Sequence, residues 1–343
     1  MIQIDRSVIS GIHSATRGTD LHEFLQNAIE LEHSTIPPYL TALFSLKPGT
    51  NQDIAGLIRS VVVQEMLHMT ISANILIAIG GHPEINHKHF IPDYPGHLPM
   101  NVGDLWVGIE PFSIPLLQNV FMAIEQPEHP AKVTKMFEAA VEQFATIGQF
   151  YDAIKEQIQK LGPDIFVQTK APPQVVVNKW FSPNELFPIT DPDSACRAID
   201  VIKIEGEGTP CDPFASPLDL SHYFKFSEIV EGRKVIPTPT GYSYGGDSIL
   251  FDSSGVWPLR PNCKIADFAP NTQARTRISQ FAYNYANLLN TLHNAFNGDP
   301  SRIDVAIGLM YDLRILAAAL MQTPDPTKPG FNIGPSFEYV QAQ

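Results

Sequence analysis

The distribution of proline is the feature of this sequence that most restricts its fold. The chain has 343 residues and 30 prolines, about 9 % against the roughly 5 % of average proteins. Proline inside a helix removes a hydrogen bond and clashes with the preceding turn, so long helices are confined to proline-free windows. Five such windows exceed twenty residues: 1–36, 49–82, 131–162, 271–299 and 301–323. We therefore expect an all-α fold with long proline-rich connectors and no recognisable sheet.

Composition and charge exclude several classes of protein. Apolar residues make up 44 % of the chain, which predicts a folded globular protein rather than a disordered one. The net charge of −13 makes nucleic acid and anionic membranes poor partners. The most apolar stretch, 54–79, contains Arg59, Glu65 and His68, which argues against a membrane span. No export signal is visible at the N-terminus, so we expect a cytoplasmic protein.

The window 49–82 carries the clearest helical pattern. Alternate steps of three and four residues select Ile58, Val61, Glu65, His68, Ser72, Ile75 and Ile79. A carboxylate and an imidazole thus lie within an otherwise mostly apolar face. Gly80 and Gly81 are expected to end this helix.

A second carboxylate occupies a core position in the first window. The same stepping gives Leu21, Leu25, Ala28 and Glu32, followed seven residues later by Tyr39. The pair at 37–38 is Pro-Pro, so we expect a disturbance or kink one turn after Glu32.

The remaining helical segments carry further polar candidates. The window 131–162 has a stripe that contains Glu142 and Gln149. A shorter helix is expected from a cap at residue 191 or 193 to about residue 206, with Glu205 on its apolar face. The last two windows, 271–299 and 301–323, predict an antiparallel pair of apolar helices.

Glu65, His68 and Glu32 together suggest a metal site. Residues three apart on a helix project on one side, so Glu65 and His68 can bind the same ion, and Glu32 can complete the site from another helix. Iron, manganese and zinc accept this mixture of carboxylate and imidazole ligands. The alternative interpretation is an ordinary solvated Glu-His pair, because a single Glu-x-x-His occurs often by chance.

Several short motifs occur along the chain in one characteristic order: 30–40 (ELEHSTIPPYL), 65–69 (EMLHM) with Asn74, 80–83 (GGHP), 146–151 (TIGQFY), 206–208 (GEG) and 221–223 (SHY). Together they resemble the ferritin-like family. They also resemble its iminophenylpyruvate dimer synthase branch, which is found in bisindole pigment biosynthesis and in many uncharacterised bacterial proteins. The segments 297–298, 308–311 and 334–339 also fit the family.

The resemblance implies a ferritin-like four-helix bundle over 1–230, with 231–343 packed on it as a proline- and glycine-rich segment and a C-terminal helix pair. It implies a two-metal centre, most naturally di-iron, with Glu32, Glu65 and His68 as ligands and Tyr39 as a hydrogen-bonding or redox-active neighbour. A fourth-helix Glu-x-x-His is missing, which leaves Glu205 or Glu207 as the carboxylate and His222 as the imidazole. On the third helix, the resemblance points to Gln149, with Glu142 as its rival.

Two functions follow from this interpretation. The first is a redox metalloenzyme that brings O₂ or peroxide to a small organic substrate, for which the resemblance implies oxidative coupling of an imine derived from an aromatic amino acid. The second is a ferritin-like protein that binds metal or a partner without turnover, which a missing third-helix carboxylate would favour. In either case we expect no nucleic-acid partner, and a homo-oligomer is compatible with the sequence.

Overall fold

The computed structural model describes residues 2–127, 144–167, 172–177, 179–208, 212–216 and 219–341, and only the backbone of Glu207. This part of the chain is mostly helical, as expected. Its α-helices are α1 (Arg6–Ser14), α2 (His22–Ser45), α3 (Gln52–Ala78), α4 (Ile114–Leu116), α5 (Met122–Ile124), α6 (Ile147–Leu161), α7 (Pro192–Glu207), α8 (His222–Glu231), α9 (Gln273–Phe296) and α10 (Ile303–Met321). A π-helical turn, η3 (Leu117–Phe121), joins α4 and α5 into one helical segment.

The connectors contain short strands, which corrects the expectation of a purely helical chain. Strand β1 (Phe214–Ser216) pairs antiparallel with β2 (Asp219–Leu220). Strand β3 (Ile236–Thr238) pairs antiparallel with β4 (Gly241–Ser243). Each pair forms a two-stranded sheet, and strands of two or three residues show too little hydrophobic periodicity to be recognised in the sequence.

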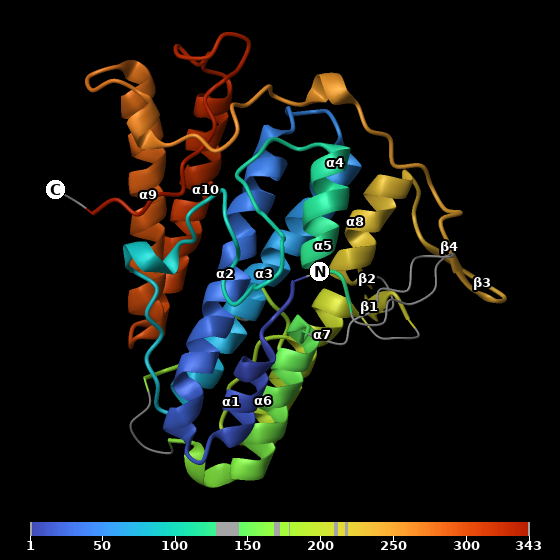
Figure 1. Ribbon diagram of the computed structural model, residues 1–343, viewed down its shortest axis with the longest axis vertical. Helices are drawn as coiled ribbons and strands as arrows, with labels where there is room; N and C mark the ends of the chain where they lie inside the picture. Colours follow the sequence, from blue (N-terminus) through green and yellow to red (C-terminus); the bar gives the residue numbers. More distant parts are fainter. Residues whose placement is uncertain are drawn as a thin grey trace.

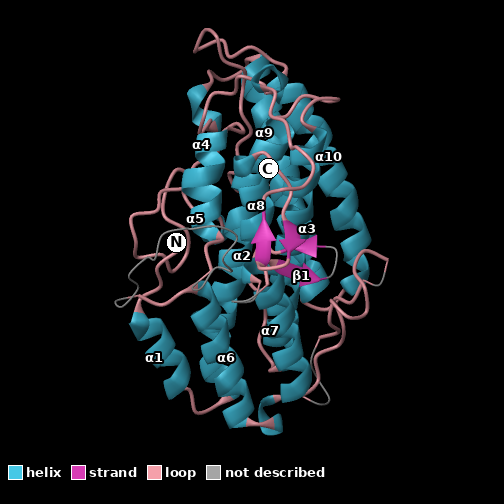
Figure 2. Ribbon diagram, turned by 90° about the vertical axis from the view of Figure 1, so that its right-hand side faces the viewer, coloured by secondary structure: helices cyan, strands magenta, loops and turns pink. Residues whose placement is uncertain are grey.

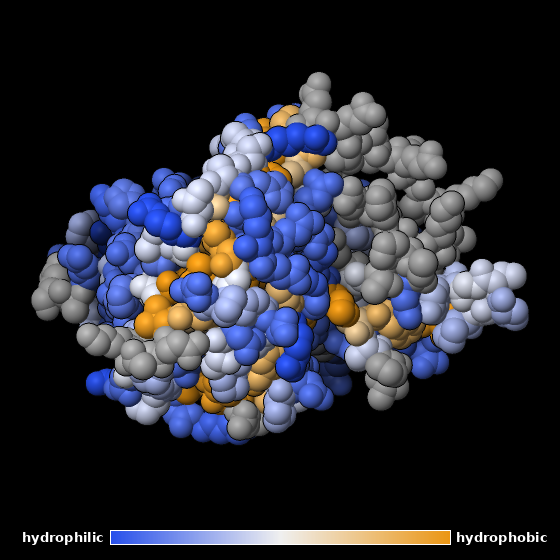
Figure 3. All heavy atoms as spheres, turned by 90° about the horizontal axis from the view of Figure 1, so that it is seen from below, coloured by the Kyte–Doolittle hydropathy of each residue, from blue (hydrophilic) through white to orange (hydrophobic). Residues whose placement is uncertain are grey.

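The long helices α2 and α3 pack against each other at the centre of the molecule (Figure 1). The pair α9 and α10 lies on one side of them, and α4 to α8 lie on the other. Both ribbon views place the α4–α5 segment above α6, and α8 above α7 (Figure 2). Seen from below, polar residues cover much of the surface, with apolar residues in patches between them (Figure 3).

Helix α2 continues through Pro37 and Pro38 to Ser45, so the two prolines do not end it. Pro38 has no N–H to donate to the Ser34 carbonyl four residues earlier. The hydroxyl of the buried Tyr94 donates to that carbonyl instead, at 2.6 Å. A hydrogen bond from the connector that follows α3 therefore satisfies a carbonyl that proline leaves without its helical donor.

Helix α3 is long and apolar enough to cross a membrane, yet it is a core helix here. Of its most apolar 18-residue window, 83 % is buried inside the protein. The helix ends as expected, because Gly80 follows its last turn with a φ of +85°, a left-handed conformation that favours glycine.

One predicted helix start changed and one was confirmed. In the window 131–162, the described helix begins only at Ile147, where Thr146 caps it; residues 128–143, with Glu142, lie outside the described part of the chain. Helix α7 begins at the predicted cap, since the Asp191 carboxylate accepts from the Ser194 N–H.

The C-terminal windows form the expected neighbouring helices α9 and α10. Tyr285 of α9 hydrogen-bonds Nε2 of His33 on α2 at 2.6 Å, which ties the pair to the central helices. Burial lowers the pKa of His33 to about 3, so its ring is neutral at pH 7.

Asn74 of α3 provides a test of this architecture. Its side chain donates to the Val175 carbonyl at 2.8 Å and accepts from the Val175 N–H at 3.0 Å, with both residues buried. Asn74→Ala removes the donor and the acceptor of this side chain, which leaves the buried N–H and C=O groups of Val175 unsatisfied. We therefore expect this variant to lower the free energy of unfolding by about 2–4 kcal/mol. Urea denaturation measures this change.

Gln26→Ala is the matched control. Gln26 makes the same pair of bonds to the backbone of Glu84, at 2.8 and 3.0 Å, but at the surface, where water replaces them. We expect a loss of less than about 1 kcal/mol. Equal losses in the two variants would contradict the role given to Asn74.

Candidate metal centre

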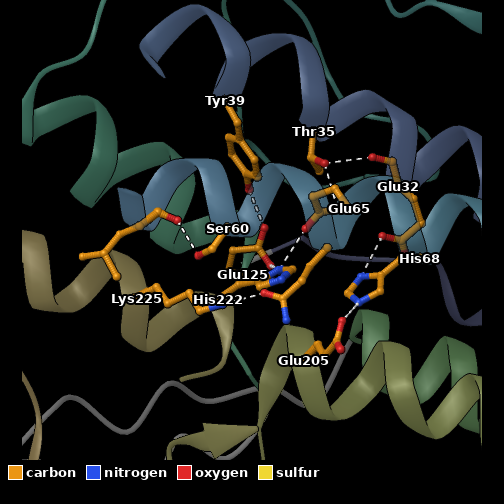
Figure 4. Close-up of polar contacts among 12 residues, drawn as sticks. Glu32, Thr35, Tyr39, Ser60, Glu65, His68, Glu125, Glu205, His222 and Lys225 are labelled. Carbon is orange, nitrogen blue, oxygen red and sulfur yellow. Dashed lines mark hydrogen bonds and ion pairs between the residues drawn. The ribbon is translucent and has the colours of Figure 1, made fainter. Parts of the chain in front are cut away.

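Four carboxylates and two imidazoles form one buried cluster between the central helices and the shorter ones (Figure 4). Five of these side chains line a common cavity, and the sixth, Glu205, contacts His68. Each of these side chains belongs to a residue that is at most 9 % exposed. They are Glu32 of α2, Glu65 and His68 of α3, Glu125 directly after α5, Glu205 of α7 and His222 at the start of α8.

One half of the cluster is centred on His68. Its Nε2 lies 3.0 Å from Oε2 of Glu205, and its Nδ1 lies 3.6 Å from Oε2 of Glu32. The other carboxylate oxygen of Glu32 accepts a hydrogen bond from the Tyr151 hydroxyl. A histidine, two carboxylates and a tyrosine thus form one group.

The other half has the same composition around His222. Its Nδ1 lies 2.9 Å from Oε1 of Glu65 and 3.4 Å from Oε2 of Glu125. The Tyr39 hydroxyl donates to Oε1 of Glu125 at 2.5 Å. The two imidazole rings stack with their centroids 5.4 Å apart, so the halves are adjacent.

Glu65 lies between the two halves. The Thr35 hydroxyl donates to its Oε2 at 2.9 Å, while its Oε1 is beside His222. One ligand atom each from Glu65, His68 and His222 can be chosen so that all three lie within 4.8 Å of one another. Glu65 is therefore placed to contact ions in both halves.

Aromatic side chains enclose the cluster beside Tyr39. Its ring packs edge-on against Phe121 at 4.5 Å and against Phe226 at 5.3 Å between centroids. Phe121 ends the π-helical turn η3, four residues before Glu125. Such π-turns occur often at functional sites, because the extra residue redirects the side chains that follow.

The protonation of the cluster reflects its crowded negative charge. Burial, reinforced by the nearby charges of Glu125 and Glu32, raises the pKa of Glu65 well above its usual value. Burial alone would lower the pKa of His68, but its hydrogen bonds to Glu205 and Glu32 raise it to about 9. The metal-free cluster therefore keeps a proton on His68 at pH 7, and protonation of Glu65 is favoured.

The partners of His68 show the opposite shift. Burial would raise the pKa values of Glu32 and Glu205, but the hydrogen bond and charge of His68 outweigh it and lower both. Burial and the neighbouring carboxylates raise the pKa values of Tyr39 and Tyr151 well above 10. Both tyrosines are thus neutral hydrogen-bond donors at physiological pH.

The donor set fits two divalent cations. Four ionised carboxylates bring four negative charges into a buried site, which is costly without cations, and two divalent ions would neutralise them. Neither nitrogen of the buried His222 makes a hydrogen bond within the described part of the chain, despite the short distance to Glu65. An imidazole left in this state is suited to coordinate a metal.

The structure brings together Glu32, Glu65, His68, Glu205 and His222, five of the residues selected from the sequence. Tyr39 is also present, but it contacts Glu125. Gln149 is placed elsewhere: its Oε1 accepts from the Thr146 N–H in the cap of α6, and it does not line the cavity. Between Glu205 and Glu207, the side chain of Glu205 reaches His68, while the side chain of Glu207 lies outside the described part of the chain, as does Glu142.

Glu125 was missed because it lies in the connector 83–130, where the proline content argued against a helix. Pro115 lies in the first turn of α4, where proline favours a helix start, and Ser113 caps that start. The cap, the proline and the mostly apolar segment 116–124 were a signal that could have revealed it. Tyr151, whose hydroxyl donates to Glu32, was also not selected from the sequence.

The protonated state predicts the pH dependence of metal binding. A divalent ion must displace the proton of His68, whose pKa is about 9, together with any proton on Glu65. We expect at least one proton to be released per chain at pH 7, and an affinity for Mn²⁺ that rises at least about tenfold from pH 6 to pH 7. Calorimetric titration in buffers of different ionisation enthalpy counts the protons. An affinity that is constant from pH 6 to pH 8 would contradict this protonation state.

Comparisons with known proteins agree with this geometry. A crystal structure of a ferritin-like protein from Caulobacter vibrioides superimposes with a TM-score of 0.56 at 21 % identity, over 87 % of this chain and 96 % of the other, which shows a shared fold. No curated protein matches the chain. The family model described as Ferritin-like matches residues 25–231, which span α2 to α8 and contain all six side chains of the cluster. The chain therefore belongs to the Ferritin-like family.

Proposed function

We propose that this protein is a two-metal oxidoreductase that acts on a small organic substrate, with iron as the metal and manganese as the closest substitute. The observation that carries the proposal is the buried set of four glutamates and two histidines. Carboxylate-bridged two-metal bundles use one glutamate from each of two helices and a Glu-x-x-His from each of the other two. Glu32 and Glu125 supply the single carboxylates, and Glu65 with His68 supplies one complete pair.

The second pair is divided between two helices. Glu205 lies near the end of α7 and His222 at the start of α8, and the two helices contact each other. We infer that α7 with α8 takes the place of the fourth helix of the bundle, and that the α4–α5 segment with α6 takes the place of the third. Glu125 then lies at the end of the α4–α5 segment, and Glu205 and His222 lie where α7 ends and α8 begins.

The surrounding residues have defined roles in this proposal. Tyr39 and Tyr151 each donate a hydrogen bond to an outer carboxylate, Glu125 and Glu32, and so fix the orientation of these ligands. Thr35 does the same for Glu65. When bound, the metal ions supply Lewis acidity and redox chemistry toward O₂ or peroxide.

The size of the cavity restricts where an organic substrate can bind. Its volume is about 40 Å³, which is room for a few atoms the size of a water molecule. An aromatic substrate must therefore approach from outside the cavity, past lining residues that are only half-buried, such as Gln126, Lys203 and Gly206. The resemblance to the iminophenylpyruvate dimer synthase branch supports an imine from an aromatic amino acid as the substrate.

The same small volume favours a second candidate, a protein that binds metal without turnover. A cavity filled by two ions and a few small ligands leaves no internal space for an organic molecule. Metal binding is common to both candidates, so the distinction depends on turnover.

Metal content tests the ligand assignment. Chain purified under reducing conditions without chelators and loaded with Fe²⁺ is expected to hold about two ions, measured by inductively coupled plasma mass spectrometry. Glu65→Ala, His68→Ala and Glu125→Ala should each hold one ion or fewer, because each removes a ligand atom. Glu30→Ala is the control, since Glu30 on the same helix as Glu32 binds Gln26 and does not line the cavity. Two ions in Glu125→Ala would contradict the assignment of Glu125.

Turnover tests the oxidoreductase. Iron-loaded protein is mixed aerobically with imines generated from phenylalanine or tryptophan, and products are followed by mass spectrometry. We expect a coupled product that depends on O₂ or peroxide and falls at least about a hundredfold in Glu65→Ala, which loses the central carboxylate. Unchanged imines in the presence of fully loaded protein would contradict the enzyme and favour metal binding without turnover.

A further inference from the structure

A second cavity lies on the other side of α2 and α3 from the metal centre. Its volume is about 710 Å³, and it is bounded by α2, α3, α9 and α10. It shares no lining residue with the metal cavity among the described residues. The two sites are thus separated by the layer that α2 and α3 form, and the larger cavity is within the range of small-molecule sites.

The cavity is long. Its lining extends from His33 on α2 to Lys47, just after the end of that helix, which is about 21 Å at the rise of an α-helix. An extended chain can use this length, whereas a compact ring system fills only part of it.

The lining is mainly apolar and adaptable. Leucine, isoleucine, valine and aromatic side chains dominate it, and Met66, Met69 and Met310 contribute flexible thioethers. Binding of a hydrocarbon in place of water on apolar surface of this extent lowers the free energy and so favours the complex.

The charged residues that line the cavity have a single sign. Lys47, Arg59 and Arg314 contribute to it, and its described lining contains no aspartate or glutamate. This is unexpected for a chain of net charge −13. Arg59 and Arg314 are exposed, and neither makes an ion pair with another described residue. Lys47 follows α2 and Arg59 lies in the second turn of α3, so both are near the connection between these helices.

We propose that this cavity binds a long-chain monocarboxylate, such as a free fatty acid. The hydrocarbon chain lies between the α2–α3 and α9–α10 pairs, and the carboxylate lies at the surface among Lys47, Arg59 and Arg314. Apolar burial supplies the affinity, and the cations select an anionic head over a neutral one.

Binding of hexadecanoate to the full-length, delipidated protein tests this proposal. We expect one molecule per chain with a micromolar Kd, measured by displacement of a fluorescent fatty acid. 1-Hexadecanol, which lacks the charge, should bind at least tenfold more weakly. From octanoate to hexadecanoate, the affinity should rise at least threefold for every two methylene groups. No binding, or equal binding of acid and alcohol, would overturn the proposal.

Variants locate the site. Ile307→Trp fills the cavity from α10 and should weaken hexadecanoate binding at least tenfold, and the double variant Arg59→Glu with Arg314→Glu should do the same. The control Arg6→Glu reverses an exposed charge on α1, which does not line the cavity, and should leave the Kd unchanged. Iron content should remain that of the wild type in all of them, which verifies folding without reference to the fatty acid.

Other occupants give other results. If phospholipid vesicles bind while free hexadecanoate does not, the face is a membrane contact and the proposal fails. If the cavity instead receives a second copy of the chain, the protein is a dimer that Ile307→Trp dissociates and hexadecanoate does not bind. Variants that bind hexadecanoate as tightly as the wild type would also overturn the assignment to this cavity.

Discussion

The accumulation of buried negative charge at one point is the constraint on which the rest of this structure depends. Four glutamates lie in one buried cluster, and in the metal-free protein a proton on His68 offsets part of their charge. Each carboxylate has a partner: a tyrosine for Glu32 and Glu125, Thr35 for Glu65, and His68 for Glu205. Such a cluster is costly for folding unless cations compensate it, so the arrangement is best understood as a site kept for metal.

The sequence was sufficient for the part of the site that long helices carry. Glu32, Glu65 and His68 lie on helices with uninterrupted apolar periodicity, so their core positions could be read directly. Glu205 followed from the apolar face of α7. Glu125 could not be found in this way, because α5 is a single turn within a proline-rich connector. His222 was reached only through the family resemblance, since residues 206–221 separate it from Glu205.

Proline has different effects at different places in this chain. At Pro38 the helix continues, because Tyr94 supplies the missing donor to Ser34. At Pro115 it favours the start of the segment that ends at Glu125. Between α7 and α8 the helix is interrupted, and His222 is supplied by the start of a separate helix, α8. The prolines mark the limits of α3, α9 and α10, but elsewhere the effect of each proline depends on contacts distant in sequence.

The central claim is that six side chains hold two metal ions. An anomalous difference map from crystals of the iron-loaded protein, with data collected at the iron edge, tests this most directly. The account predicts two peaks inside the cavity, one beside Glu32, His68 and Glu205 and one beside Glu125 and His222, with Glu65 in contact with both. No peak in the cavity, or a single peak with Glu125 and His222 unbound, would contradict it.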